Sequence, residues 1–269
     1  MAAARPAFMQ QLEARARAAN SLLCVGLDPR TESVAELRKE CARLIEATAE
    51  AAAAFKPNSA FFEVHGPEGW QALRDVIASV PEGIPVILDA KRGDIADTAE
   101  AYARAVFDGL GAGSLTVSPY LGGDSLAPFV RRPEHGAFVL CHTSNPGAGE
   151  LQELPVGAPE GAQPLYEWVA RQAPGWTRHD NLGLVVGATR PGAMVRVRAL
   201  APRAWILAPG VGAQVGDLAA TVRAGLRNDG LGLLVNVSRG LARAADPKAE
   251  AQRLAQTIRE IQAERQGRP

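Results

Sequence analysis

Short, nearly continuous apolar runs recur along the chain and alternate with longer segments of helical periodicity. Runs that are apolar throughout are typical of strands covered on both faces of a parallel sheet. The run at 53–55 is the least distinct, because the alanines that precede it also suit the end of a helix. We predict eight strands, at residues 22–27, 53–55, 86–88, 114–117, 137–141, 182–186, 204–207 and 231–235.

The segments between these runs carry apolar residues at spacings of three and four, which indicates amphipathic helices. Several begin at Pro, Asp or Ser, residue types that suit the first turn of a helix. One long segment rich in Gly and Pro, residues 143–162, has no such pattern, and loops of that length often serve as lids or binding loops. The predicted helices span residues 33–52, 67–79, 95–108, 163–172, 192–200, 215–227 and 247–264, and an extra helix is expected near the N-terminus.

The alternation of strand and helix, repeated eight times, predicts an α/β fold, a single (β/α)8 TIM barrel that covers residues 1–269. A doubly wound open sheet is the alternative, although that fold does not need eight regular repeats. No linker, low-complexity tract or change of composition divides the chain.

Composition excludes several classes of protein. Lys plus Arg equal Asp plus Glu at 29 each, and no apolar stretch is long enough to cross a membrane. Neither a nucleic acid nor a membrane is therefore an expected partner. Three cysteines without a CxxC pair, and the lack of a secretory signal, predict a cytoplasmic protein. The histidines form no HxH or HExxH pattern, so no metal site is expected.

The densest charged cluster is Asp-Ala-Lys-Arg-Gly-Asp at 89–94, at the carboxyl end of a predicted strand, where barrel active sites lie. Because strand residues two apart point the same way, Asp89 and Lys91 should share one face. Lys56 should lie on the neighbouring strand and Asp94 in the following turn. Only four of the 29 basic residues are lysines, which favours a chemical need for Lys56 and Lys91, since lysine can release its proton.

Two interpretations of this cluster remain open. One is a structural ion-pair network, although burying four charges is usually less stable than apolar packing. The other is a catalytic site, in which the lysines keep both acids ionised and supply a proton where a carbanion develops.

A phosphate site is predicted at the ends of the last two strands. The Pro-Gly-Val-Gly turn that begins with Pro209 and Gly210 lets backbone amides approach an anion. Arg239 follows the next strand and can bind phosphate through two nitrogens. Loops in these positions of a barrel frequently bind phosphate.

Other strand-end residues have two interpretations each. Asp28 either caps a turn or hydrogen-bonds a sugar hydroxyl. Ser144 and Asn145 either shape the turn before Pro146 or hydrogen-bond the amide edge of a substrate.

Taken in order, these motifs resemble the orotidine 5′-phosphate decarboxylase family, and in particular its longer bacterial, type 2, subfamily. The resemblance covers essentially the whole chain. The Asp-x-Lys-x-x-Asp spacing is shared with related sugar-phosphate barrels, whereas the ordered set is more specific. The set comprises Asp28, Phe-Lys-Pro-Asn at 55–58, Asp-Ala-Lys-Arg-Gly-Asp-Ile at 89–95 with Thr98, Thr-Ser-Asn-Pro at 143–146, Pro-Gly-Val-Gly-Ala-Gln at 209–214 and Ser238-Arg239.

The resemblance implies that orotidine 5′-monophosphate becomes uridine 5′-monophosphate and carbon dioxide, the last step of de novo pyrimidine synthesis, with no metal or organic cofactor. Lys91 would protonate C6 as carbon dioxide leaves. Asp89 would lie against the substrate carboxylate, and Lys56 would contact the ribose and hold Asp89. Asp94 completes the implied catalytic set.

The resemblance also implies how the substrate is bound. Asp28 would bind a ribose hydroxyl, and Ser144 would hydrogen-bond the pyrimidine. Gln214 and Arg239 would bind the phosphate, with Gln214 able to bridge to the base. The remaining substrate-binding residues that it implies are Asn58, Pro209, Gly210 and Ser238.

Family members are homodimers, so the resemblance implies that Asp94, Ile95 and Thr98 reach into the partner's site. One departure is Ala96, where many relatives carry Gly or Pro. Two rivals remain: a magnesium-dependent sugar-phosphate barrel, such as a keto-gulonate phosphate decarboxylase or a hexulose phosphate synthase, and a barrel that binds nucleotides without turnover.

Overall fold

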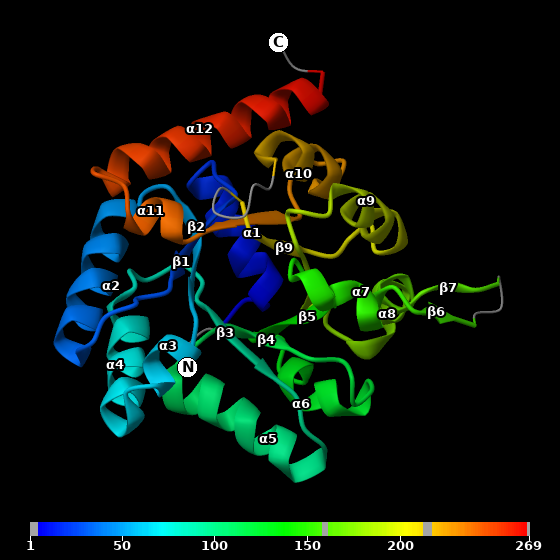
Figure 1. Ribbon diagram of the computed structural model, residues 1–269, viewed down its shortest axis with the longest axis horizontal. Coiled ribbons are helices and arrows are strands. Elements are labelled where there is room, and N and C mark those ends of the chain that lie inside the picture. The colour runs from blue at the N-terminus through cyan, green and yellow to red at the C-terminus, as the bar shows by residue number, and fades with distance from the viewer. Residues whose placement is uncertain (1–4, 158–160, 212–216, 268–269) are drawn as a thin grey trace.

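The computed structural model describes residues 5–157, 161–211 and 217–267. In this part of the chain eight parallel strands form one sheet that curls into a barrel, and helices surround it (Figure 1). Most residues of the strands are buried, which explains why apolar runs mark them in the sequence. The strands of the barrel are β1 (Leu23–Leu27), β2 (Ala52–Pro57), β3 (Ile87–Arg92), β4 (Ser114–Val117), β5 (Gly136–His142), β8 (Leu182–Val186), β9 (Ile206–Pro209) and β10 (Leu233–Val237).

The barrel closes at a seam between β2 and β3. The other neighbours pair in parallel in the order β2-β1-β10-β9-β8-β5-β4-β3. Across the seam, single bridges join Phe55 to Val86 and Asn58 to Asp89. The predicted (β/α)8 barrel is thus confirmed, with one weakly paired seam.

Several of the surrounding helices begin at a polar N-cap residue whose side chain accepts a hydrogen bond from a backbone amide of the first turn. Ser33 accepts a hydrogen bond from the amide of Glu36 at 3.3 Å, and Asp217 accepts one from the amide of Ala219 at 2.8 Å. The helices of the described residues are α1 (Phe8–Ala18), α2 (Val34–Thr48), α3 (Ala60–Glu63), α4 (Gly66–Ser79), α5 (Ala96–Arg104), α6 (Ala127–Val130), α7 (Gly149–Gln152), α8 (Leu165–Gln172), α9 (Pro191–Leu200), α10 (Leu218–Gly225), α11 (Arg239–Ala242) and α12 (Pro247–Arg265).

The extra helix expected near the N-terminus is α1, which covers the amino-terminal end of the barrel. Phe8 occupies space that two glycines leave open. A Cβ on Gly113 would come within 2.9 Å of its ring, and one on Gly136 within 2.6 Å. Arg15 donates a hydrogen bond to the carbonyl of Ala52 at 2.9 Å. Helix α1 therefore forms the floor of the barrel.

The boundary between α2 and β2 differs from the prediction. Helix α2 ends at Thr48, so the predicted helix over 33–52 is too long, and Ala52 already belongs to β2. The alanines at 51–54 are buried. Their small side chains fit a strand covered on both sides, and the carbonyl of Ala52 is bound by Arg15 instead of a helical amide. Tertiary packing therefore overrides the high helix propensity of these alanines.

The long segment 143–162 is not wholly irregular. It contains a 3₁₀ turn at Pro146–Ala148, helix α7 and strand β6 (Pro155–Val156). Strand β6 pairs antiparallel with β7 (Gln163–Pro164), and this hairpin projects from the barrel in Figure 1. The predicted helix over 163–172 therefore begins at Leu165 instead. Helix α5 of the predicted segment 95–108 continues as a π-helix at Ala105–Leu110.

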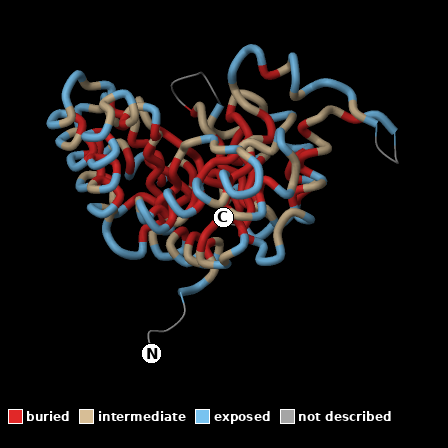
Figure 2. Tube along the Cα trace, turned by 90° about the horizontal axis from the view of Figure 1, so that it is seen from below, coloured by how far each residue is buried: buried red, intermediate tan, exposed pale blue. Residues whose placement is uncertain are grey.

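The buried residues gather along the barrel and beneath the helices (Figure 2). They form one continuous hydrophobic cluster that joins α1, the strands and the inner faces of the surrounding helices. Within the described ranges, no helix combines the length and the apolar character that crossing a membrane requires.

Candidate functional site

Three predicted charged residues meet at the carboxyl end of the barrel, beside the seam. Nζ of Lys56 lies 2.9 Å from Oδ2 of Asp89, and Nζ of Lys91 lies 2.6 Å from Oδ1 of the same carboxylate. The Lys56 side chain is 3% exposed, that of Asp89 is 13% exposed and that of Lys91 is 50% exposed. The carboxylate is thus held between a buried ammonium group and one that faces solvent.

Opposing effects set the charges of this cluster. Burial by itself raises the pKa of the Asp89 carboxyl, but the ammonium groups of Lys56 and Lys91 outweigh burial and hold that pKa well below its usual range. Burial likewise lowers the pKa of Lys56, but the carboxylates of Asp89 and Asp28 outweigh it and raise that pKa. The site therefore keeps a fixed negative charge beside an ammonium group at neutral pH.

Thr116 on β4 shapes the end of β3, and it was not among the residues predicted for the site. The β3–β4 register shifts after Leu88, and Lys91 adopts a left-handed φ of 46°. Oγ1 of Thr116 accepts hydrogen bonds from the amides of Ala90 and Lys91 at 3.1 and 2.9 Å. It donates one to Oδ1 of Asp89 at 2.9 Å. Asp89 and Lys91 therefore meet as predicted, but through a bulge and not through regular strand alternation.

Asp94 does not join this cluster within one chain. Its Oδ1 accepts a hydrogen bond from the amide of Ile95 at 2.8 Å. Among the described residues it forms no ion pair with either lysine. The predicted set of two acids and two lysines is reduced, within one chain, to one acid and two lysines. Ile95 is 58% exposed and Thr98 is exposed, so both side chains face away from the core.

Asp28 and Ser238 lie together at the ends of β1 and β10. Oγ of Ser238 donates a hydrogen bond to Oδ2 of Asp28 at 2.5 Å, and within the described ranges Oδ1 of Asp28 is a buried acceptor without a donor. Gly26 permits this approach, because a Cβ there would lie 2.6 Å from Cβ of Ser238. Asn58 is partly used locally, since its Oδ1 accepts from the amide of Ala60 at 3.2 Å.

The predicted phosphate-binding residues come from neighbouring strands. Pro209 ends β9 and pairs in register with Asn236 of β10, which precedes Ser238 by two residues and Arg239 by three. Gly210 has a φ of 100°, a conformation that glycine adopts without strain. These residues therefore adjoin at the carboxyl end of the barrel. Gln214 lies outside the described residues.

Ser144 lies in the turn after β5, pressed against the end of β8. A Cβ on Gly187 would lie 2.8 Å from Cβ of Ser144 and 2.9 Å from its backbone nitrogen. Thr143, immediately before it, donates from its hydroxyl to Oδ1 of Asn145 at 2.6 Å. Oδ1 of Asn145 is therefore used within the turn, as one of its two interpretations expects.

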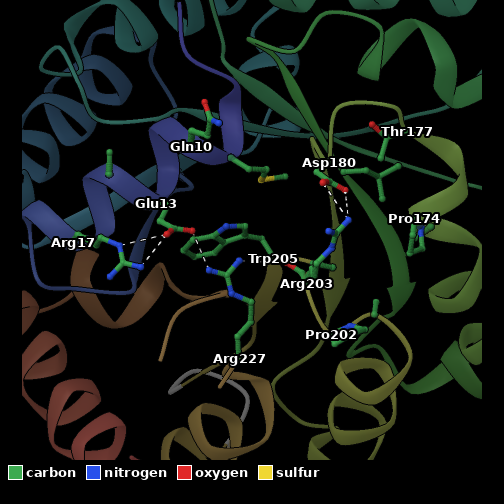
Figure 3. Close-up of a pocket in the computed structure, with 16 residues that line it drawn as sticks. Gln10, Glu13, Arg17, Pro174, Thr177, Asp180, Pro202, Arg203, Trp205 and Arg227 are labelled. Atoms are coloured by element: carbon green, nitrogen blue, oxygen red, sulfur yellow. Dashed lines mark hydrogen bonds and ion pairs between the residues drawn. The ribbon is translucent and has the colours of Figure 1, made fainter. Parts of the chain in front are cut away.

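A separate cleft of about 640 Å³ lies at the opposite end of the barrel, between α1 and the starts of β8 and β9 (Figure 3). Its charged side chains pair with one another. Glu13 contacts Arg17 and Arg227 at 2.9 Å each, and Asp180 contacts Arg203 at 2.9 Å. The clustered lysines and their carboxylate lie at the other end, where barrel active sites are found.

The fold and the site define a class of protein: a (β/α)8-barrel enzyme that holds a carboxylate between two lysines at its strand ends. Over residues 21–254 the chain matches the model of the orotidine 5′-phosphate decarboxylase / HUMPS family. The chain belongs to this family, whose members include decarboxylases.

Similar proteins cover almost the whole chain. The orotidine 5′-phosphate decarboxylase of Roseiflexus castenholzii is 48% identical over 265 residues, 94% of this chain and 96% of the relative. That of Thermomicrobium roseum is 46% identical over 276 residues, 96% of each chain.

Solved structures give the same result. The OMP decarboxylase of Leishmania donovani is 56% identical, with a TM-score of 0.90 over 95% of this chain and 99% of that one. The UMP synthase of Leishmania donovani is 58% identical, with a TM-score of 0.92 over 96% of this chain, which spans 57% of that longer chain.

Proposed function

We propose that this protein converts orotidine 5′-monophosphate to uridine 5′-monophosphate and carbon dioxide, without a cofactor, and that Lys91 is the proton donor. The observation that carries the proposal is the carboxylate of Asp89 held between Lys56 and Lys91 at 2.9 and 2.6 Å. The names of the relatives support the substrate.

The proposed step needs few groups. The bond between C6 and the substrate carboxylate breaks, its electron pair stays on C6, and carbon dioxide leaves. The ammonium group of Lys91 stabilises the developing negative charge and transfers its proton to C6. Because Lys91 is half-exposed, its amine can regain a proton from water. Asp89 lies against the departing carboxylate and fixes the position of Lys91.

The electrostatics of the site support a reaction without a metal. The carboxylate of Asp89 already accepts contacts from two ammonium groups and from the hydroxyl of Thr116. The ammonium groups of Lys56 and Lys91, 2.9 and 2.6 Å from this carboxylate, repel a divalent cation that approaches it. The magnesium-dependent relatives are thus the less suitable model for this site.

The deciding experiment follows the decarboxylation of orotidine 5′-monophosphate by ultraviolet absorbance, with excess chelator, for the wild type and Lys91→Ala. We expect turnover that the chelator does not change and that collapses in the variant. Turnover abolished by the chelator would support a magnesium-dependent reaction. Binding of uridine monophosphate without any turnover would support a nucleotide-binding barrel.

The remaining strand-end residues are proposed to bind the substrate. Asp28 binds a ribose hydroxyl through its buried Oδ1, which has no donor among the described residues, and Ser144 hydrogen-bonds the pyrimidine. Arg239 and the turn at Gly210 bind the phosphate, together with Gln214. Binding energy from the phosphate should help the chemical step, so orotidine without phosphate should lose kcat as well as affinity. An unchanged kcat with orotidine would contradict this role.

We further propose a homodimer in which Asp94, Ile95 and Thr98 reach into the partner's site. Ile95, next to Asp94 in the chain, is an apolar side chain that is 58% exposed, as expected of a residue that a partner subunit covers.

Subunit mixing tests the shared site. Lys91→Ala and Asp94→Ala subunits are each inactive in this scheme, but a hybrid dimer contains one intact site and should regain activity. No recovery, after subunit exchange has been demonstrated by mass spectrometry, would contradict the shared site. A cytoplasmic location is also proposed, because all three cysteines are free, buried thiols.

A further inference from the structure

Helix α7 holds the end of β5 through one glutamine. Oε1 of Gln152 accepts a hydrogen bond from the amide of Thr143 at 2.8 Å, and its Nε2 donates one to Oγ1 of the same threonine at 2.8 Å. The threonine hydroxyl in turn donates to Oδ1 of Asn145 at 2.6 Å. One side-chain amide thus fixes the residues on both sides of Ser144.

Two further contacts lock the same turn. Glu153, the next residue after α7, places Oε1 3.1 Å from Nε2 of the buried His142. On the other side, the backbone of Gly187 donates to the carbonyl of His142 at 2.7 Å and lies against Ser144. The turn that carries Ser144 therefore lies between the end of β8 and the carboxyl end of α7. Gln152 makes more of the hydrogen bonds from α7 to this turn than Glu153 does.

We propose that Gln152 is a positioning residue that places Ser144 for hydrogen bonding to the pyrimidine ring of the substrate. It acts through Thr143 and does not touch the substrate. This inference rests on the proposed function, because it takes from it the role of Ser144. It adds that base recognition depends on α7, which lies in the segment between β5 and the β6–β7 hairpin.

Because Gln152 is linked to only one part of the proposed substrate site, its loss should affect recognition of the base and not of the ribose phosphate. The phosphate residues Gly210 and Arg239 lie at the ends of β9 and β10. Contacts from Gln152 reach the turn after β5, and none of those found in the described residues involves β9 or β10. Loss of Gln152 should therefore weaken recognition of the base and leave recognition of the ribose phosphate intact.

The test measures the affinity of two ligands by calorimetry. Uridine 5′-monophosphate carries the base, whereas ribose 5-phosphate lacks it. We expect Gln152→Ala to weaken uridine monophosphate binding roughly tenfold, about 1.4 kcal/mol, and to change ribose 5-phosphate binding less than twofold. The matched control is Glu150→Ala, an exposed residue on the same helix, which should change neither affinity.

Two further variants separate positioning from general damage. Gln152→Glu keeps the acceptor for the Thr143 amide and should recover part of the lost affinity. A double variant of Gln152→Ala with Ser144→Ala should bind uridine monophosphate no more weakly than Ser144→Ala alone, because both changes remove one interaction. If Gln152→Ala does not fold, Thr143→Val, which removes only the hydroxyl, gives the same comparison.

Equal weakening of both ligands, or fully additive effects in the double variant, would overturn the inference. The proposed function is judged separately by turnover of the wild type. A wild type that fails to decarboxylate orotidine monophosphate refutes that function, whereas the two affinities still decide the role of Gln152.

Discussion

Replacement of Lys56 by methionine should destabilise the protein as well as inactivate it. The Lys56 ammonium is almost completely buried and lies 2.9 Å from a carboxylate that is 13% exposed. Its removal leaves Asp89 with the half-exposed Lys91 and the hydroxyl of Thr116. Removing one partner of a buried ion pair typically costs about 3–5 kcal/mol, and here Asp89 keeps only the partial compensation of Lys91, whose ammonium group faces solvent.

This cost can be converted into a melting temperature. For domains of this size, 1 kcal/mol corresponds to roughly 2–4 °C, so a loss of about 4 kcal/mol predicts a Tm lower by roughly 8–16 °C. Asp89→Asn should show a comparable loss, because it leaves the ammonium group of Lys56 in the interior. The double variant, with no buried charge at this pair, should be more stable than the sum of the two single losses predicts.

The sign of the pH dependence follows from the two pKa shifts. The pKa of Asp89 is lowered in the folded state, so its contribution is present above the unfolded value of about 3.9 and is lost as the pH falls below it. The pKa of Lys56 is raised, so its contribution is present below about 10.4 and is lost as the pH rises towards the folded value. The stability difference between wild type and Lys56→Met should therefore be flat between about pH 5 and 9.

Differential scanning calorimetry of the four proteins at several pH values measures all these quantities. A loss below about 1 kcal/mol for Lys56→Met at pH 7 would refute the reasoning, since that is the value of a solvated surface pair. Strict additivity of the two single changes would refute it as well, because the two groups would then not interact.

Other changes have equally definite outcomes. Lys91→Ala should lower kcat by roughly 10²–10⁴-fold, the usual contribution of a proton donor, with a smaller loss of Tm than Lys56→Met, as steady-state kinetics and calorimetry can show. Gly187→Ala would place a Cβ 2.8 Å from Cβ of Ser144 and should cost about 1–3 kcal/mol in a urea melt while raising KM. Arg198→Met should cost about 1–3 kcal/mol in the same melt for each buried carbonyl that it leaves without a donor, since the guanidinium donates to the carbonyls of Gly225 and Gly232, each at 2.7 Å. Normal KM for Gly187→Ala, or normal stability for Arg198→Met, would contradict these assignments.

Much of the barrel could be predicted from apolar runs because its strands are buried on both faces, which makes them continuous in sequence. The alanine segment before Phe55 was assigned wrongly to a helix up to residue 52. Alanine is the best helix former, and nothing in the local pattern shows that Arg15, far away in sequence, binds the carbonyl of Ala52. Only tertiary contacts decide such a segment.

In the candidate site too, some residues could be predicted from the sequence and others depend on tertiary contacts. Lys56, Asp89 and Lys91 could be predicted because charged residues at strand ends are conspicuous in an apolar pattern. Thr116 was missed, although a buried polar residue within the apolar run at 114–117 was a visible signal. Gln152 was missed because its helix, α7, lies in a segment without periodicity. Within one chain Asp94 forms no ion pair with the lysines in the described residues, since spacing alone does not show where the chain turns after a bulge, and its approach across a dimer stays a prediction.

The floor that α1 forms has a consequence for the order in which the protein assembles. Gln11 of α1 lies beside Glu134, 123 residues later in the chain, and Phe8 fills the space between glycines that precede and begin β4 and β5. During synthesis the contacts of this helix with β2 can form early, whereas those of Phe8 and Gln11 must wait until β4 and β5 have been made, so part of its apolar face stays uncovered until then. Closing the long loop between Gln11 and Glu134 is entropically costly, so we expect the docking of α1 to be completed late in folding. Helix α1 is therefore made early, but the floor that it forms can be completed only after β4 and β5 have been made.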